Sequence, residues 1–242
     1  MVDLPSYFSA KALKSVSSDE SMQQAYRLRY DVYCLERRFL DSGAYPDGLE
    51  RDNYDSDSEH FHSYNHKNEL VGYSRLIVPD VKGHFPWQIH CNALLAQVEL
   101  PPRQESAEIS RLVVRQDYRR RCGDTPSRGR QRDVSDPKGV EWQLASPQIL
   151  LVLYRQMYHY SLAHGIRYWY AAMEHPLARS LQMMNFSFVK IGPEADYFGP
   201  VAPYIADLRA LERRLGQSNP EMLAWMQMPE RNNCLLYTSD AA

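Results

Sequence analysis

The sequence lacks long hydrophobic runs and a secretory signal. Its densest apolar stretch, QILLVLY at 148–154, is much shorter than the roughly 18 residues that a membrane-spanning helix needs. The first residues, MVDLPSYFSAKALKSV, contain no apolar core of the kind that a signal peptide requires. We therefore expect a protein that does not span a membrane.

An excess of charge of one sign is also absent, and cysteine is scarce. The chain has 28 Lys and Arg against 30 Asp and Glu, so no overall basic field indicates nucleic acid as a partner. The cysteines form no CxxC pair and no spacing typical of a metal site: Cys34, Cys91, Cys122 and Cys234. We expect no bound metal, no nucleic-acid partner and a reducing, cytoplasmic compartment.

The remaining composition is that of an ordinary globular protein, with 242 residues, 44% of them hydrophobic and 24% charged. No internal repeat is visible, and we expect a single domain over residues 1–231. The last nine residues, CLLYTSDAA, follow the polar stretch RNN and show no pattern of a helix or a strand. We expect residues 232–242 to be a non-native tail.

Hydrophobic periodicity and turn residues predict helices and strands in alternation. We expect a helix over 19–39, a hairpin of strands 60–66 and 69–79, a strand over 107–114, a helix over 146–165, a strand over 166–173, a helix over 175–185 and a strand over 186–193. Ser146 would cap the second helix with Pro147 in its first turn, one short helix would lie near 93–97, and the arginine-rich stretch 115–136 would be a loop. This order predicts an α/β or α+β fold, a mixed sheet covered by helices.

The strand AEISRLVV (107–114) carries charged residues at its centre. Strict alternation would place Glu108 and Ser110 on one face and Ile109 and Arg111 on the other. Further polar residues interrupt the other predicted elements: Arg29, Asp52, Asp55 and Arg75. Such mutually compensating charges indicate either a cleft with chemistry or a structural salt-bridge network, and spacing alone leaves both open. No histidine has a partner pattern that indicates a role.

Four blocks resemble, in order and spacing, the signature blocks of the acyl-homoserine-lactone synthase family: RYDVYCLERRF (29–39), ERDNYD (50–55), GYSRL (72–76) and EISR (108–111). The family has an Arg-x-x-x-aromatic helix opening, an Asp-x-x-Asp loop, a Gly-x-x-Arg-Leu strand and a Glu-x-Ser/Thr-Arg strand. The resemblance implies that substrate is bound by Arg29, Tyr33, Phe39, Asp52, Asp55, Arg75 and Arg111.

Two departures shift the resemblance towards a sister group. Tyr33 and Phe39 stand where autoinducer synthases usually have phenylalanine and tryptophan. The C-terminal half, with DYFGPVAPYIA (196–206), looks more like the N-acyl amino acid synthases and the acyltransferases associated with PEP-CTERM/exosortase gene clusters. Over residues 20–210, this resemblance implies a GNAT fold, an acyl-carrier-protein thioester as donor and a small amine as acceptor.

The residues suit amide formation from a thioester. A carboxylate is needed to take a proton from the acceptor amine, and Glu108 is our choice for this base. The Ser110 hydroxyl and backbone N–H groups after Arg111 are candidate donors to the tetrahedral oxyanion. Arg75 or Arg111 would bind the acceptor carboxylate, while Asp52 and Asp55 would hold the ammonium or orient the arginines.

The donor is expected to be acyl carrier protein, without a further cofactor. GNAT enzymes that use coenzyme A hold its pyrophosphate with an Arg-x-x-Gly-x-Gly/Ala loop, whereas this chain reads RRCGDT at 120–125. Arg119, Arg120 and Arg121 would face the acidic carrier, although a solvated loop explains them equally well. Two other functions stay open, an acyl-homoserine-lactone synthase using S-adenosylmethionine and a non-catalytic module that binds acyl groups or a partner.

Overall fold

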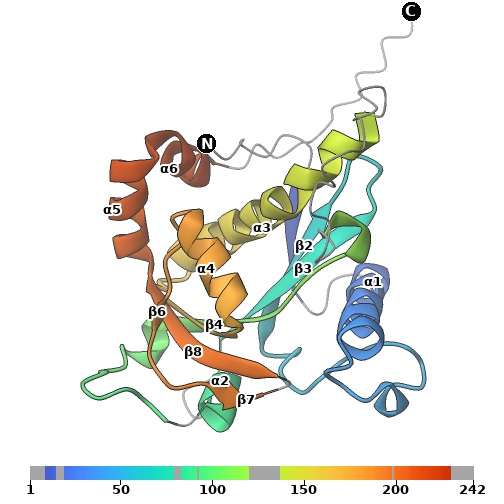
Figure 1. Cartoon of the computed structure of the whole chain (residues 1–242), viewed down its shortest axis with the longest axis horizontal. Helices are drawn as coiled ribbons and strands as arrows, with labels where there is room; N and C mark the ends of the chain where they lie inside the picture. The colour runs from blue at the N-terminus through green and yellow to red at the C-terminus, as the bar shows by residue number, and fades with distance from the viewer. Residues whose placement is uncertain are drawn as a thin grey trace, which may run out of the picture.

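The computed structural model describes residues 9–14, 19–78, 83–91, 93–119, 137–197 and 199–229, without the side chains of 9–19 and 137–146. A single mixed sheet runs through the protein (Figure 1). Its strands lie in the order β1 (Ser9–Lys14), β2 (Ser58–Tyr64), β3 (Leu70–Ile77), β4 (Ser106–Val114), β5 (Tyr168–Met173), β8 (Pro200–Asp207) and β6 (Val189–Lys190), and β7 (Ala195–Asp196) pairs with β8. Neighbours pair antiparallel except β4 and β5, which are parallel.

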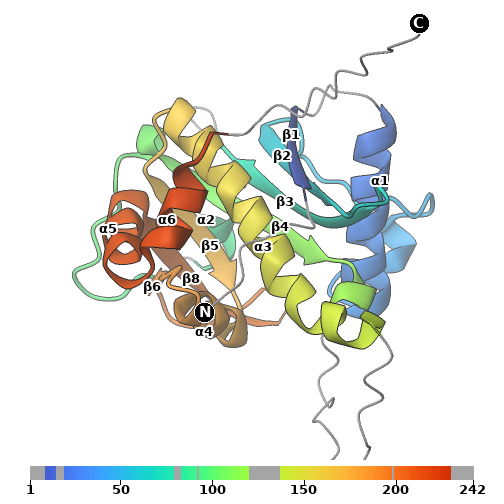
Figure 2. The same cartoon turned by 90° about the horizontal axis from the view of Figure 1, so that it is seen from above.

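Helices cover the two faces of the sheet (Figures 1 and 2). One face packs against α3 (Pro137–Ala163), α4 (His175–Met183), α5 (Leu208–Ser218) and α6 (Pro220–Gln227). The other face packs against α1 (Asp19–Tyr30), which continues as a π-helix over Asp31–Glu36, and against α2 (Pro86–His90). Short 3₁₀ turns span Ser42–Ala44, Arg103–Glu105 and Gln116–Tyr118. Within the described residues, no helix is long and apolar enough to cross a membrane.

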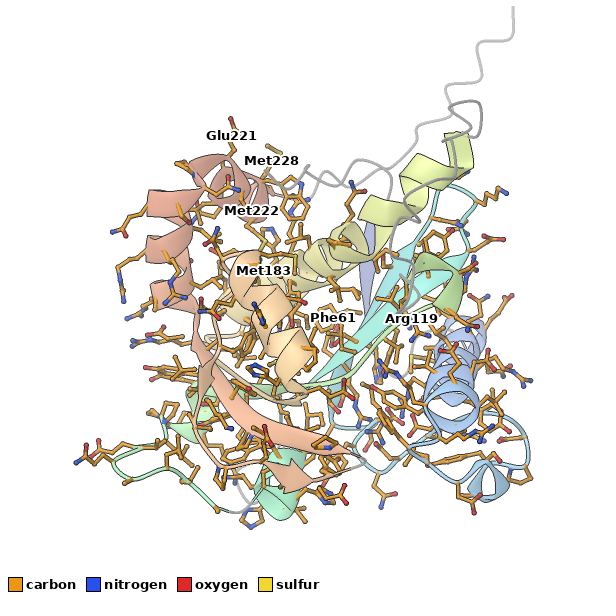
Figure 3. All side chains as sticks on the ribbon, in the orientation of Figure 1. Phe61, Arg119, Met183, Glu221, Met222 and Met228 are labelled. Atoms are coloured by element: carbon orange, nitrogen blue, oxygen red, sulfur yellow. The ribbon has the colours of Figure 1, made fainter. Side chains whose placement is uncertain are left out.

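The alternation of side chains along the strands builds both cores. Trp169 of β5 packs beside Tyr154 of α3, with 5.9 Å between the ring centroids. The next residue, Tyr170, points to the opposite face, where its ring lies 5.2 Å from Phe85 and 5.0 Å from Trp87. A strand buried on both faces needs apolar residues at consecutive positions, as YWYAAM provides. Of the residues labelled in Figure 3, Phe61 is fully buried, whereas Met183 and Met228 are exposed.

Most predicted elements are confirmed. The fold is the expected mixed sheet covered by helices, and the hairpin, the strand at 107–114 and the strand before α4 lie where the sequence predicted them. The first helix reaches Glu36 through its π-helical end. Gly165 ends α3 as expected, with a φ of +71° that favours glycine.

Several predictions are wrong. The helix expected to begin at Pro147 begins at Pro137, because an internal proline removes one hydrogen bond without having to end a helix. The short helix expected near 93–97 is instead α2, and the strand expected over 186–193 is reduced to Val189–Lys190. The strands β1 and β8 and the helices α5 and α6 were not predicted, and in β8 the two prolines argued against a strand.

One topological feature positions the site. β4 and β5 pair over Ser106–Glu108 and Tyr168–Tyr170. A cavity of about 320 Å³ is lined by the residues that follow on both strands, 109–114 of β4 and 171–173 of β5. The end of the parallel pairing therefore opens the sheet at Glu108, and the cavity lies in that opening.

Candidate active site

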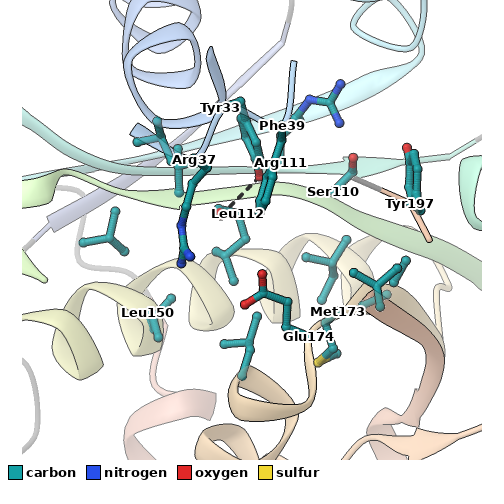
Figure 4. A pocket seen from close by; sticks show the side chains of 18 of the residues that line it. Tyr33, Arg37, Phe39, Ser110, Arg111, Leu112, Leu150, Met173, Glu174 and Tyr197 are labelled. Atoms are coloured by element: carbon teal, nitrogen blue, oxygen red, sulfur yellow. Dashed lines mark hydrogen bonds between the residues drawn. The ribbon is translucent and has the colours of Figure 1, made fainter. Parts of the chain in front are cut away.

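The cavity has mostly apolar walls (Figure 4). Tyr33 and Phe39 come from the π-helix and the turn after it, while Met173 comes from β5 on the other side. The Tyr33 hydroxyl lies 3.5 Å from the backbone oxygen of Leu112, which fixes this ring against β4. Its volume is at the lower end of the roughly 300–1,000 Å³ typical of small-molecule sites. Both aromatic residues expected to bind substrate thus line the cavity.

Beside the cavity, arginines and carboxylates alternate in a buried cluster, which we call the ionic cluster: Arg29, Arg75, Arg111, Glu50, Asp52 and Asp55. Its charges balance, with as many arginines as carboxylates. Six residues from α1, the loop before β2, β3 and β4 are thereby joined in one network. The sequence had predicted that five of them would come together.

The two inner arginines each pair with two carboxylates. Arg29 is 0% exposed, and its Nε donates to Glu50 at 2.5 Å and its Nη1 to Asp55 at 2.6 Å. Arg75 is 1% exposed and forms a two-pronged pair with Asp52, at 2.6 and 2.7 Å. Its Nη1 also donates to Asp55 at 2.5 Å. Planar, bidentate pairs of this kind are the strongest that arginine makes.

These contacts keep the carboxylates ionised although they are buried. Burial alone would raise the pKa of Asp52, but the hydrogen bonds and charge of Arg75 outweigh it and lower that pKa well below its usual range. Burial is likewise outweighed at Glu50, whose pKa is lowered by Arg111 and Arg29. At neutral pH the ionic cluster is therefore a set of paired charges, which is what a buried location demands.

A β-bulge aims Arg111 at this cluster. Tyr73 pairs with Val113 and Arg75 with Ser110, so that one residue of β3 lies opposite two of β4. Arg111 has a φ of +53°, which is uncommon for a residue other than glycine and is often found at functional sites. The expected alternation is therefore wrong at this point: Ser110 and Arg111, consecutive in sequence, both reach the ionic cluster.

Contacts of these two residues follow from the bulge. Arg111 Nη2 lies 3.1 Å from both Glu50 Oε1 and Asp52 Oδ2. Arg111 therefore lies close to Asp52, one of the two carboxylates expected either to hold the acceptor ammonium or to orient the arginines. The Ser110 hydroxyl accepts a long hydrogen bond from Arg75, 3.4 Å from Nη2, which leaves its own hydrogen free to donate.

Glu108 lies in the cavity wall and is 3% exposed. Its Oε2 accepts a hydrogen bond of 3.1 Å from the backbone N–H of Trp87. Burial raises the pKa of Glu108 to about 8, against the opposing effects of the Trp87 N–H and the positive charges of Arg75 and Arg111. A carboxyl group that titrates near neutral pH is suited to general acid–base catalysis. The catalytic role expected of Glu108 remains a prediction.

Of the three predicted docking arginines, Arg119 is the one that lies within the described residues. Arg119 lines the cavity and is paired with Glu36 of the π-helix. Figure 3 labels it beside the first helix. Arg120 and Arg121 lie outside the described residues. A role in binding a carrier protein is therefore still a prediction for all three.

Sequence reasoning missed three residues of the site. Glu50 is 0% exposed and joins Arg29 to Arg111, and its position at the start of the quoted block ERDNYD was the available signal. His60 has a ring nitrogen 2.7 Å from the Tyr73 hydroxyl and the other 2.9 Å from the backbone oxygen of Asp55. Tyr197 lines the cavity from the turn between β7 and β8, a region in which the sequence gave no pattern for a catalytic group.

The fold agrees with comparisons to known proteins. Residues 28–125 match the family model described as an acetyltransferase (GNAT) domain. No curated protein sequence matches the chain. The structure is similar to the acyl-homoserine-lactone synthase LasI, with a TM-score of 0.58 and 19% identity over 82% of this chain and 89% of that one.

Two further structures have the same fold. The CoA-dependent acyl-homoserine-lactone synthase BjaI, solved with SAM and isopentyl-CoA, has a TM-score of 0.59 and 23% identity over 86% of this chain and 90% of that one. TofI, in a ternary complex with an inhibitor and MTA, has a TM-score of 0.58 and 16% identity over 84% and 96%. The chain therefore resembles a GNAT acetyltransferase domain over residues 28–125, and its fold is one that the acyl-homoserine-lactone synthases share.

Proposed function

We propose that this acyltransferase forms an amide, by moving a long-chain fatty acyl group from a carrier-protein thioester to the α-amine of an amino acid or a related small amine. The observation that carries the proposal is the position of Glu108. This buried carboxyl group lies where an apolar cavity meets a cluster of arginines and carboxylates. An acyl chain suits the cavity, and a zwitterionic acceptor suits the charged side.

The chemistry requires a base, an oxyanion donor and a defined leaving group. Ionised Glu108 takes a proton from the acceptor ammonium, the free amine attacks the thioester carbonyl, and a C–N bond forms. The tetrahedral oxyanion is stabilised by the Ser110 hydroxyl, whose hydrogen is not used by Arg75. The intermediate then collapses to the amide as the C–S bond breaks, and the thiolate leaves with a proton returned from the site.

The sequence left Arg75 and Arg111 as alternative residues to bind the acceptor carboxylate, and the two differ in how deeply they are buried. The Arg75 side chain is 1% exposed and is held by two carboxylates. The Arg111 side chain is 13% exposed and lies in the wall of the cavity. These contacts favour Arg111 as the residue that binds the acceptor, and they give Arg75 the task of holding Asp52 and Ser110 in position.

The second candidate is an acyl-homoserine-lactone synthase that uses S-adenosylmethionine. The fold likeness to LasI and BjaI favours it. S-adenosylmethionine also carries an α-ammonium and a carboxylate, so the same charged side of the cavity would receive it. A non-catalytic protein that binds acyl groups is the third candidate, and for it the ionic cluster would be a structural network.

One assay separates the three candidates. The protein is incubated with long-chain acyl carrier protein or acyl-CoA, together with a panel of amino acids or S-adenosylmethionine, and the products are identified by mass spectrometry. We expect an N-acyl amino acid, formed faster from the carrier-protein thioester. A homoserine lactone would instead establish the second candidate, and acyl binding without any amide product would establish the third.

The choice of donor can be tested with the arginine-rich segment. Replacing Arg119, Arg120 and Arg121 together with Ala should lower kcat/KM for acyl carrier protein and leave turnover of acyl-CoA less affected. The loss should be largest at low ionic strength, because steering of an acidic partner is screened by salt. Arg119→Ala alone is the control for the contact of Arg119 with Glu36. Equal rates for wild type and triple variant at low salt would exclude a docking role.

A further inference from the structure

The helix α2 holds the proposed base by a single hydrogen bond. Glu108 Oε2 accepts the backbone N–H of Trp87, a residue of α2, at 3.1 Å. The helix has only five residues, and helices of this length are not stable without tertiary contacts. The contacts that fix α2 in the fold therefore also fix the hydrogen bond to Glu108.

Aromatic packing anchors α2 to the sheet. The Trp87 side chain is 2% exposed, and its ring centroid lies 5.0 Å from that of Tyr170 in β5. Phe85, the residue before the helix, lies 5.2 Å from the same ring. Tyr170 is the register partner of Glu108 in the parallel pairing of β4 and β5. Burial of apolar surface is not directional, so this packing fixes the distance of α2 from the sheet more than the direction of the Trp87 N–H.

Gln88 supplies directional contacts at the start of α2. Its Oε1 accepts the backbone N–H of Phe85 at 3.1 Å, and its own backbone N–H donates to the Phe85 oxygen at 3.0 Å. These two bonds close the turn in which the N–H of Trp87 lies. The same Oε1 also accepts a longer bond of 3.4 Å from Arg103 Nη2. One amide oxygen thus connects the first turn of α2 to a residue outside the helix.

Arg103 lies on the segment that leads into the strand of the base. It begins the 3₁₀ turn Arg103–Glu105, and β4 begins at the next residue, Ser106, two positions before Glu108. Its guanidinium also lies over the Phe85 ring, 5.4 Å from the centroid. Arg103 therefore links the helix that donates the hydrogen bond to the strand that accepts it.

We infer that Gln88, tied to Arg103, is a positioning residue that aims the Trp87 N–H at Glu108 and thereby favours the ionised base at neutral pH. This inference rests on the proposed function, in which ionised Glu108 takes a proton from the acceptor. Gln88 is half-buried and is not among the residues that line the cavity. It therefore acts through the backbone of Trp87 and not on the substrate.

The effect of the hydrogen bond can be separated from that of nearby charges. A donated N–H favours the ionised carboxyl group, so Trp87 lowers the pKa of Glu108, against the larger effect of burial. Charges at Gln88 play no part, because the side chain is neutral. The ionisable groups that interact with this carboxyl are Arg75, Arg111, Asp52, Tyr54, Cys91 and Tyr197. A Gln88 variant leaves all of them in place, so a changed titration of Glu108 reports the hydrogen bond.

The test is Gln88→Met, which keeps an unbranched side chain and removes the accepting oxygen. We expect kcat/KM at pH 7 to fall roughly 10-fold, the low end for a hydrogen bond to a charged group, because less of Glu108 is then ionised. The inflection of the pH profile should move up by about one pH unit, which corresponds to a tenfold change in proton affinity. At alkaline pH the rates of variant and wild type should converge, whereas a general structural defect would lower the rate at every pH.

Two controls and a direct titration make the test specific. Gln104→Met makes the same chemical change at an exposed residue beside Arg103, and Ile89→Ala alters an exposed residue of α2 itself, so neither should move the inflection. The titration of Glu108 is also followed without substrates, by its carboxyl ¹³C signal, which is assigned by its absence in Glu108→Gln. The inference is overturned if this signal titrates at the same pH in Gln88→Met as in the wild type. If the wild type makes no amide with any acceptor, the proposed function is refuted, and the carboxyl titration still decides whether Gln88 aims the Trp87 N–H.

Discussion

Glu108→Gln is expected to lower kcat by roughly 10²-fold or more, the low end of general-base contributions, while the protein stays folded. Glutamine preserves the shape of the side chain and still accepts the hydrogen bond from the Trp87 N–H, so the cavity wall keeps its structure. It cannot accept a proton from the acceptor ammonium. Raising the pH should partly rescue the variant, because more of the acceptor amine is then already neutral.

The pH profile of the wild type gives a second test of the same residue. The pKa of Glu108 is raised to about 8, so the ionised base is a minor form at pH 7 and kcat/KM should rise with pH through about 8. Glu108→Gln should lose this inflection. Glu105→Gln is the control, since Glu105 lies just before β4 and outside the cavity lining, and its profile should match the wild type.

Unfolding measurements distinguish a catalytic role of Glu108 from a purely structural one. A carboxyl whose folded-state pKa lies above its unfolded value of about 4.3 contributes stability that is fully present below pH 4 and is lost as pH rises towards 8. Glu108→Gln removes this loss, so the variant should be at least as stable as the wild type at pH 8 in urea unfolding. Full activity together with a fall in stability would mean that Glu108 is a structural brace and that the catalytic interpretation is wrong.

The sequence predicted the members of the site better than their arrangement. Charged residues inside apolar strands are conspicuous, so Arg75, Glu108 and Arg111 were found from pattern and resemblance. Their arrangement depends on the bulge opposite Ser74, which no local pattern announces because Arg111 adopts a positive φ only in its tertiary context. Strict alternation was the reasonable expectation. The bulge instead brings the consecutive residues Ser110 and Arg111 to the same ionic cluster.

Residues whose role depends on distant partners were the ones missed. Glu50 stands in an acidic, loop-like stretch, and only the fold reveals that it is enclosed between two arginines. Tyr197 precedes a strand that contains two prolines, and its stack on His90 joins segments about 110 positions apart. Long-range pairing of this kind arises from sheet topology, which propensity and periodicity do not encode.

The sharing of partners in the ionic cluster also determines how much stability Arg111→Ala should cost. An isolated pair would leave one buried carboxylate without a partner and so would destabilise the protein strongly. Here, removal of Arg111 leaves Glu50 paired with Arg29, and Asp52 with Arg75. We therefore expect Arg111→Ala to affect activity more than stability, and we expect the largest stability loss at the most deeply buried carboxylate of the ionic cluster.

That residue is Glu50, and Glu50→Ala should lower the free energy of unfolding by about 3–5 kcal/mol, the usual cost of removing one partner from a buried ion pair. Arg29 is 0% exposed and would lose the acceptor of its Nε, while Arg111 would lose its three hydrogen bonds to Glu50. For a chain of 242 residues this corresponds to a fall in Tm of roughly 6–20 °C. Thermal unfolding followed by circular dichroism at pH 7 measures it.

Two comparisons make the expected loss at Glu50 specific. Arg51→Ala removes the neighbouring ion pair with Asp47, whose side chains are 52% and 45% exposed, and should change stability by no more than about 1 kcal/mol. In a double-mutant cycle, Glu50→Ala combined with Arg111→Ala should cost less than the sum of the single variants, by about 0.5–3 kcal/mol, because the two residues are bonded to each other. If Glu50→Ala were no more costly than Arg51→Ala, the three arginines would not need Glu50 to remain buried. Arg111 would then have to be held at the cavity by its contact with Asp52.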